Sequence, residues 1–461
     1  MKIYNTLTGK KQEFVPLEAG KVKMYACGIT VSGEAHIGHA YQALIYDIIR
    51  KYLEKKGYAV TYARNYTDVD DKIIAKSNET GIPADQYAAE MIKNIDGQMA
   101  RLRVGEPTLW LKATETIGEI EDFIRALIEK GHAYATEKGD VYFSVESFPG
   151  YGKLSHRNLE DAANGVRVEN DELKKNPLDF ALWKAAKPGE PSWPSPWGDG
   201  RPGWHIECSA MNRKAFGDRI DIHGGGRDLI FPHHENEIAQ SEALTGKPFA
   251  DYWIHNGLIK VNGQKMSKSL GNSLLLKDLL DRYSPETIKF ALLQTNYRGD
   301  INVTDTLFPE AEKHLAEFYE VFRAAEKLGE IAGENPAIDG KFDAAMDDDF
   351  NTALALSDLF GYFKAARAKI AAGDRSVLAD LAQIKKTYSL LGLFETAPET
   401  FLAACGAREE AVPENVKAIA EERLAARREK NWAKSDELRE KLASMGYAVK
   451  DSKEGYTLTK N

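Results

Sequence analysis

The pattern that constrains the fold most is a strand, a loop, a helix and a second strand within the first 68 residues. An apolar run that ends at Cys27 and Gly28 has the character of a buried strand entering a loop. Residues 40–58 then place apolar side chains at helical spacing and stop at Gly57, and residues 59–68 form a second strand. This βαβ order is typical of a parallel sheet, which binds ligands at the carboxyl ends of its strands. The sequence therefore predicts an α/β fold built on a Rossmann-type parallel sheet.

A similar strand that enters a glycine loop, at 219–226, precedes a predicted helix at 234–246 and indicates the second half of the same sheet. Between the halves, residues 114–136 are predicted to form a helix and 139–145 a strand, whereas 187–204 are rich in Pro, Gly and Trp and are predicted to be irregular. The sheet is therefore expected to be split by an insertion. From about residue 306 the pattern is helical, typical of a bundle, and residues 414–446 continue it before a small C-terminal hairpin.

Charge and cysteine content narrow the class of protein. The 461 residues carry a net charge of -9, which gives no hint of bulk attraction to nucleic acid, although local basic patches can still bind it. No apolar stretch approaches a membrane span, and the polar N-terminus lacks the apolar core of a signal peptide. Cysteines at 27, 208 and 405 cannot make a disulfide framework. We therefore expect a cytoplasmic protein without a membrane contact. We also expect it to be a monomer.

His36, Ile37, Gly38 and His39 stand at the start of the first predicted helix. Helix N-termini present free backbone N–H groups to phosphates, and a glycine lets a nucleotide approach the backbone. Two histidines beside that glycine could donate to phosphate oxygens. The alternative is a helix start that happens to hold two histidines.

Lys265-Met266-Ser267-Lys268-Ser269 follows the second half of the predicted sheet. Catalysis at a phosphate consists largely of positioning and charge stabilisation, which lysines supply. Alone, such a segment is more often a solvated basic turn. Its occurrence together with His-Ile-Gly-His favours a nucleotide-dependent enzyme.

These two motifs resemble the HIGH and KMSKS signatures of the class I aminoacyl-tRNA synthetases, and longer motifs resemble the cysteinyl-tRNA synthetases among them. The longer motifs are NYTDVDDKII (65–74), GWHIECSAM (203–211) and DIHGGGRDLIFPHHENEIAQ (221–240). The resemblance extends over essentially the whole chain, through PLDFALWK (177–184), DDDFNTALAL (347–356) and RREKNWAKSDELREKL (427–442). It implies a ligase that activates cysteine with ATP and Mg²⁺ to cysteinyl-adenylate and transfers it to tRNA(Cys).

The resemblance also implies a division into six regions. They are the first half of the Rossmann catalytic domain at 1–114, a connective insertion at 115–201, the second half of the catalytic domain at 202–250, a KMSKS-containing stem-contact region at 251–310, a helical bundle at 311–400 and a small mixed anticodon-binding region at 401–461.

Cys27, Cys208, His233 and Glu237 are donor types that zinc uses, and four such donors fill a tetrahedral shell. His233 and Glu237 are four residues apart at a helix start, hence on one face. Spacing leaves His234 open as an alternative ligand, and buried free cysteines are common without a metal. The resemblance implies that the four residues bind one Zn²⁺ per chain. Zinc would bind the substrate thiolate, whereas the hydroxyl of serine stays protonated and is a poor ligand.

Further roles are implied by the resemblance alone. The expected catalytic residues are His36, His39, Lys265 and Lys268. The expected ATP contacts are His36, Gly38, His39, His223, Gly225, Asp228 and Lys268, and the expected cysteine contacts are Gly28, Thr67, Trp204 and His205. The expected anticodon contacts are Arg427, Trp432 and Asp436, in a helix that could otherwise be an ordinary solvated charged helix.

The chain departs from the family pattern at Ser32 and Gly33, where an aromatic residue and an Asp are usual, and at Tyr41, where an Arg is usual. It also has Leu458 where a Trp is usual. These departures concern fine substrate or tRNA contacts. An alternative function is a zinc-dependent ligase that joins activated cysteine to a small-molecule amine, and a further one is a non-catalytic tRNA-binding module.

Overall fold

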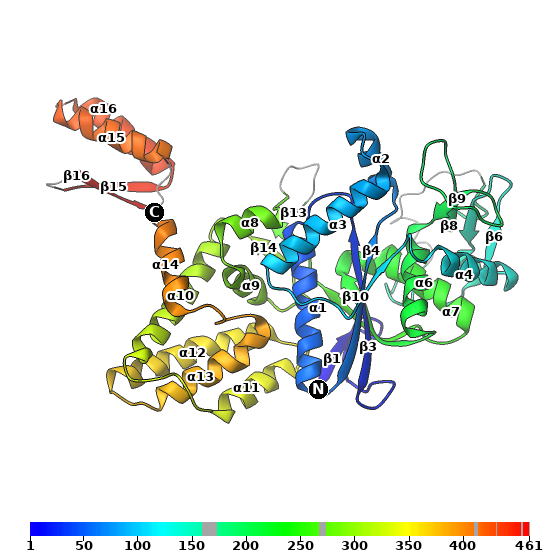
Figure 1. Ribbon diagram of the computed structural model, residues 1–461, viewed down its shortest axis with the longest axis horizontal. Coiled ribbons are helices and arrows are strands. Elements are labelled where there is room, and N and C mark those ends of the chain that lie inside the picture. The colour runs from blue at the N-terminus through cyan, green and yellow to red at the C-terminus, as the bar shows by residue number, and fades with distance from the viewer. Residues whose placement is uncertain (159–172, 267–272, 410–413, 430, 453–454, 461) are drawn as a thin grey trace. The chain divides into compact units, whose positions relative to one another are not determined.

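The computed structural model describes residues 1–158, 173–266, 273–409, 414–429, 431–452 and 455–460. A five-stranded sheet with the order β11-β10-β3-β4-β5 lies at its centre, and all neighbouring strands in it are parallel (Figure 1). The predicted α/β fold with a parallel sheet is confirmed. The strands are β3 (Lys21–Thr30), β4 (Ala59–Thr67), β5 (Leu109–Lys112), β10 (Ile220–Gly226) and β11 (Ala250–Asn256).

Helix α1 (Ile37–Lys55) connects β3 to β4 and buries most of its length. It begins three residues before the predicted helix, because the His36 side chain caps it by accepting hydrogen bonds from its first turn. Helices α2 (Asp71–Thr80) and α3 (Ala84–Arg101) connect β4 to β5 and were not predicted. Helices α6 (Trp204–Phe216) and α7 (Glu235–Thr245) flank β10 in the sequence.

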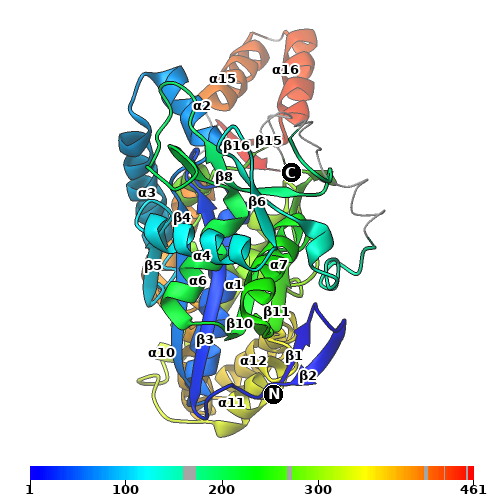
Figure 2. The ribbon, with the colours of Figure 1, turned by 90° about the vertical axis from the view of Figure 1, so that its right-hand side faces the viewer.

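An insertion separates β5 from β10, as predicted. It contains α4 (Ile117–Glu129) and an antiparallel sheet of β6 (Ala133–Ala135), β7 (Val141–Phe143), β8 (Phe180–Ala185) and β9 (Gly200–Pro202). The predicted helix 114–136 was too long, because the chain turns at Gly131, where φ is +80°, into β6. Figure 2 shows α4 beside α6 and α7. These three helices share one apolar core with the antiparallel sheet of the insertion.

Residues 1–315 and 324–395 form one compact unit, which also holds an N-terminal hairpin and most of the helical bundle. The hairpin is β1 (Lys2–Asn5) with β2 (Lys10–Glu13), and a three-stranded sheet consists of β12 (Ile259–Val261), β13 (Gln264–Lys265) and β14 (Ile301–Val303). The helices are α8 (Leu276–Arg282), α9 (Pro285–Leu293), α10 (Leu307–Glu326), α11 (Pro336–Met346), α12 (Thr352–Ala371) and α13 (Val377–Tyr388), of which α10 also enters the second unit.

The second compact unit consists of residues 316–323 and 396–461. It contains α14 (Pro398–Glu409), α15 (Glu414–Arg428), α16 (Trp432–Ser444) and the antiparallel pair β15 (Tyr447–Ser452) and β16 (Gly455–Lys460). A small core of Val416, Ala420, Leu442 and Val449 joins the helices to the hairpin. The predicted helices and C-terminal hairpin are confirmed, and the six region boundaries stay predictions. None of the described helices has the length and apolar character of a membrane span.

Candidate active site

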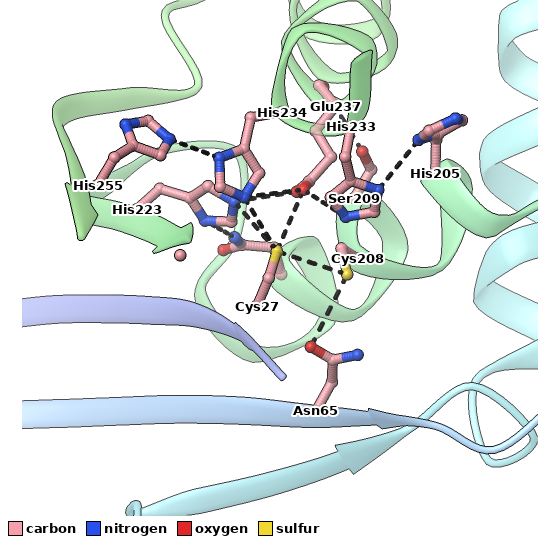
Figure 3. A network of polar contacts seen from close by, with 12 residues as sticks. Cys27, Asn65, His205, Cys208, Ser209, His223, His233, His234, Glu237 and His255 are labelled. Carbon is pink, nitrogen blue, oxygen red and sulfur yellow. Dashed lines mark hydrogen bonds and ion pairs between the residues drawn. The ribbon is translucent and has the colours of Figure 1, made fainter. Parts of the chain in front are cut away.

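Four buried donor side chains meet beside the carboxyl end of β3 (Figure 3). Cys27 lies on β3, Cys208 on α6, His233 in the helical turn before α7, and Glu237 on α7. Cys27 Sγ is 3.8 Å from Cys208 Sγ and 3.3 Å from Glu237 Oε1, which is 3.0 Å from His233 Nε2. The four predicted zinc ligands are thus brought together, with their donor atoms within 4.8 Å of one another.

A second group shares Cys27 and Glu237 but adds His223 and His234. His234 Nε2 is 3.3 Å from Cys27 Sγ, and His223 Nε2 is 3.1 Å from Glu237 Oε2. The two groups overlap, so one metal ion could be held by either set. The sequence left His234 open as an alternative zinc ligand, and the second donor group shows that His234 is close enough to the other donors to serve as one.

The donor set fits zinc. Zinc bonds of about 2.0 to 2.3 Å in a tetrahedral shell place the ligand atoms about 3.3 to 3.8 Å apart. The distances of Cys27 to Cys208 and to Glu237, 3.8 and 3.3 Å, fall in this range. The donors are also shielded from bulk water, since Cys27 and Cys208 are 3% and 2% exposed and Glu237 is fully buried. Two soft sulfur donors with an imidazole and a carboxylate are typical of a zinc site.

A layer of hydrogen bonds holds the histidines of the cluster in place. His233 Nδ1 is 3.0 Å from His205 Nδ1, and His234 Nδ1 is 2.7 Å from His255 Nε2. Thr6 Oγ1 lies 2.8 Å from the other nitrogen of His255. Such partners orient the ring of a ligating histidine and fix its tautomer.

The electrostatics of the cluster favour the charged forms of Cys208, His233 and Glu237, whereas burial raises the pKa of the Cys27 thiol. The hydrogen bond from Cys27 lowers the pKa of Cys208 to about 6, against the effect of burial. Burial lowers the pKa of His233, but the charges and hydrogen bonds of Glu237 and Cys208 together outweigh it and raise this pKa to about 10. His223 and His233 hold the Glu237 pKa well below its usual range despite burial. Cys208 therefore has thiolate character, which is the form that binds metal.

Gly28, the residue after Cys27, is required by close packing between β3 and β4. A Cβ there would lie 1.6 Å from the carbonyl oxygen of Asn65. The Gly28 N–H donates to Asn65 Oδ1 at 2.9 Å, and this same oxygen lies 3.8 Å from Cys208 Sγ. Asn65 thus connects the cluster to the neighbouring strand.

A cavity of about 440 Å³ opens next to the cluster. Six of the predicted substrate residues line it, namely Gly28, His36, Gly38, His39, Trp204 and Asp228. The Trp204 ring lies 4.3 Å from the His233 ring, so this side chain contacts both the cluster and the cavity. The cavity also has Gln42 and Asn256 in its wall, which the sequence analysis missed.

His36 and His39 stack with their ring centroids 3.6 Å apart at the start of α1. His36 Nδ1 accepts from the N–H groups of Gly38 and His39, at 3.1 and 3.4 Å, and His39 Nδ1 accepts from His36 N–H at 3.4 Å. A neutral imidazole whose Nδ1 accepts carries its proton at Nε2. Each ring therefore has an Nε2–H group, the kind of donor that a phosphate oxygen needs.

The remaining predicted contacts lie deeper or elsewhere. Four of them are not in the cavity wall, namely Thr67, His205, His223 and Gly225. The Thr67 side chain bonds to Glu207, and His223 faces the donor cluster. Lys265 ends β13, whose backbone pairs with β12, and Lys268 lies outside the described residues. In the second unit, Arg427 lies over the ring of Trp432, 5.5 Å from its centroid, and Trp432 is 56% exposed at the start of α16, which also carries Asp436.

Two of the positions that depart from the family pattern line the cavity. They are Ser32 and Gly33, and the Ser32 carbonyl accepts from the hydroxyl of Tyr87 on α3 at 3.3 Å. Tyr41 is fully buried on α1 and donates to the carbonyl of Tyr297 at 3.2 Å. Leu458 pairs in register with Val449 in the C-terminal hairpin.

Of the missed residues, His255 carries a signal in the sequence, because it places a polar side chain directly after the apolar run Tyr252-Trp253-Ile254. A polar group buried in such a stretch needs a partner, which here is His234. Asn65 and Asn212 stand beside Arg64 and Arg213 and have no such signal; their partners are Gly28 and His223.

Comparison with known folds and families agrees with this architecture. The chain superposes on a Mycobacterium tuberculosis methionyl-tRNA synthetase in complex with methionyl-adenylate, with a TM-score of 0.61, 14% identity and coverage of 84% of this chain and 93% of that one. It also superposes on an Agrobacterium radiobacter K84 LeuRS, with a TM-score of 0.60, 12% identity and coverage of 87% and 86%. The fold is that of the class I aminoacyl-tRNA synthetases.

Sequence comparison is more specific. Residues 13–313 match the model of the class I (C) tRNA synthetase catalytic domain, 341–395 that of the DALR domain, and 409–457 that of the cysteinyl-tRNA ligase anticodon binding domain. Curated relatives described as cysteine–tRNA ligases include proteins of Syntrophotalea carbinolica, 47% identical over 99% of this chain and 98% of that protein, and of Geobacter sulfurreducens, 48% identical over 99% of both. The chain belongs to the cysteine–tRNA ligase family.

Proposed function

We propose that the chain activates cysteine with ATP to cysteinyl-adenylate and transfers the cysteinyl group to tRNA(Cys). The observation that carries this proposal is the common wall of the donor cluster and the cavity. Gly28 adjoins Cys27 and lines the cavity, and Trp204 packs on His233 and lines it as well. A cysteine with its thiol at the cluster would therefore present its carboxylate toward the cavity that His36 and His39 line.

The first step would need no protein base, because the carboxylate of cysteine is ionised at neutral pH. Its oxygen attacks the α-phosphorus of ATP, and pyrophosphate leaves. His36 and His39 would donate from Nε2 to the phosphate oxygens, and Lys265 and Lys268 would add positive charge, with Mg²⁺ accompanying the nucleotide. The terminal adenosine hydroxyl of the tRNA then attacks the adenylate carbonyl, and AMP leaves.

The proposed substrate contacts divide between a cysteine end and an ATP end of the site, and four of them, Thr67, His205, His223 and Gly225, lie outside the cavity wall. Gly28, Thr67, Trp204 and His205 would bind or surround cysteine. His36, Gly38, His39, His223, Gly225, Asp228 and Lys268 would bind or surround ATP.

Cys27, Cys208, His233 and Glu237 would hold one zinc ion per chain, supported by the ligand spacing, the burial and the thiolate character of Cys208. When bound, zinc would accept the substrate thiolate, which serine cannot match because its hydroxyl stays protonated. Pocket shape alone separates such near-isosteres by only roughly 100-fold. The chain would thus select cysteine without an editing domain.

Arg427, Trp432 and Asp436 are proposed to contact the tRNA anticodon. The exposed Trp432 ring offers a face on which a base can stack, and Arg427 adds a cation beside it. Cytoplasmic location and the monomeric state stay predictions.

Aminoacylation of tRNA(Cys), with cysteine or serine and before and after zinc chelation, tests this function. We expect charging with cysteine only, loss of charging on chelation, and recovery on addition of Zn²⁺. Cysteine-dependent pyrophosphate exchange without any tRNA charging would instead support a ligase that acts on a small-molecule amine. Absence of both would leave a non-catalytic tRNA-binding role.

A further inference from the structure

The charges around the cavity are not balanced for an anionic substrate. Its wall contains two acidic residues, Glu34 and Asp228, and in the described part of the chain the only lysine or arginine in it is Lys72. Glu34 is already paired with Lys277 at 2.9 Å. A cavity that accepts phosphate groups needs a cation at its wall, and Lys72 is placed to be one.

Lys72 itself makes no ion pair with a described residue, and it is exposed. Its backbone, in contrast, is fixed at the second position of α2. The Asp70 side chain caps this helix by accepting from the Lys72 N–H at 2.9 Å. The ammonium group is therefore held near the cavity without being neutralised there.

The neighbouring Asp71 anchors the start of α2 to the insertion. Asp71 accepts from Lys184 at 2.9 Å and also pairs with Arg201, which is only 4% exposed. Lys184 and Arg201 face each other in register on β8 and β9. Two cations from adjacent strands thus bind the carboxylate of Asp71. Because consecutive residues of a helix point about 100° apart, Asp71 can face the insertion while Lys72 faces the cavity.

We propose that Lys72 binds a phosphate group of the reacting substrates and that Asp71, through Arg201 and Lys184, is a positioning residue for it. This inference rests on the proposed function. Two phosphates share the required chemistry: those of ATP, and the phosphodiester at the acceptor end of the tRNA.

The test compares Lys72→Met with Lys76→Met in the full-length chain. Lys76 lies one helical turn further along α2, is partly exposed, and is paired with Glu79 outside the cavity wall, so its variant controls for loss of one lysine from this helix. Pyrophosphate exchange without tRNA reports on ATP, and single-turnover transfer from preformed adenylate reports on tRNA.

We expect Lys72→Met to lose about ten- to hundredfold in one assay, the range for one charge-assisted hydrogen bond, and Lys72→Arg to recover part of it. A raised KM for ATP assigns the contact to the nucleotide, and slowed transfer with normal exchange assigns it to the tRNA. Activity equal to that of Lys76→Met in both assays would overturn the proposal. Failure of the unmodified chain to activate cysteine would instead refute the proposed function.

The role of Asp71 has its own readout. Asp71→Asn should reduce the same step, Asp71→Glu should restore part of it, and the double variant Asp71→Asn with Lys72→Met should be no worse than Lys72→Met alone. A further loss in the double variant would show that Asp71 acts independently of Lys72.

Discussion

Replacing Gly28 with alanine tests whether the contact between β3 and β4 sets the geometry of the donor cluster. The new Cβ would lie 1.6 Å from the Asn65 carbonyl oxygen, whereas real Cβ atoms essentially never come closer than 3.0 Å to such an atom. Both partners belong to backbones of adjacent strands, so no change of side-chain rotamer relieves the clash. The strands must separate locally by about 1.4 Å at least.

This displacement can be compared with the tolerance of a metal site. Zinc ligand distances are kept to within about 0.2 Å, so a shift several times larger at the residue next to Cys27 should remove that ligand. The hydrogen bond from Gly28 N–H to Asn65 Oδ1 would be lost with it. Overpacking of this kind lowers the free energy of unfolding by about 1 to 3 kcal/mol.

The assays are zinc content and affinity of the purified chain, cysteine-dependent pyrophosphate exchange, and urea unfolding. We expect Gly28→Ala to lose bound zinc and cysteine activation together. Gly97→Ala is a suitable control, because Gly97 lies inside α3 and a Cβ added there would meet no atom of another segment within 4 Å. Alanine at this position should raise the free energy of unfolding by about 0.5 to 1 kcal/mol. Zinc bound to Gly28→Ala with unchanged affinity would refute the reasoning.

Five further substitutions test other parts of the molecule. His233→Ala should lose zinc while His234→Ala keeps most of it; the opposite order would assign the metal to the second donor group. Trp432→Ala should weaken tRNA charging and spare pyrophosphate exchange, and equal loss of both would indicate a folding defect. Tyr41→Phe removes a buried hydrogen bond and should lower the free energy of unfolding by about 1 kcal/mol. Urea unfolding measures this, and an unchanged value would show that the bond contributes nothing to stability. Burial lowers the pKa of Lys289 to about 8, so above that pH the unfolded chain binds more protons than the folded chain. The free energy of unfolding should therefore rise between about pH 8 and 10. Lys289→Met should remove this rise, and a rise that persists in the variant would exclude Lys289 as its cause.

Local patterns in the sequence were enough to predict the central sheet. The apolar run that contains Cys27 and the periodic helix that follows depend on neighbours in the chain, so β3, α1 and β4 could be recognised from residues 21–67 alone. The periodic stretch began only at residue 40, but His36 to His39 were correctly placed at the start of the helix, where His36 caps α1 although histidine is not among the usual capping residues. Helices α2 and α3 were missed although Asp70 is a usual cap and Gly81 adopts the left-handed conformation that ends α2.

The site was less predictable, because its members come from distant segments. The donor types of Cys27 and Cys208 suggested a metal, but 181 residues separate them and only the fold brings their sulfurs to 3.8 Å. Residues whose role is to hold others are hard to recognise: His255 lies in no motif, and the motif NYTDVDDKII does not show what its Asn65 contacts. Their partners are defined by tertiary contacts, which periodicity cannot supply.

The irregularity in β3 explains how a metal cluster and a nucleotide cavity can share one wall. The register between β3 and β4 shifts between Ala26 and Ile29, so Cys27 and Gly28 lie at the irregular step. Such a step bends a strand and redirects the residues within it. Here it leaves Cys27 facing the cluster, while the neighbouring Gly28 packs its backbone on Asn65 and borders the cavity. A change that displaced β3 at this step would therefore move the metal ligand Cys27 and the cysteine end of the cavity together, which is why Gly28→Ala should impair zinc binding and adenylate formation together.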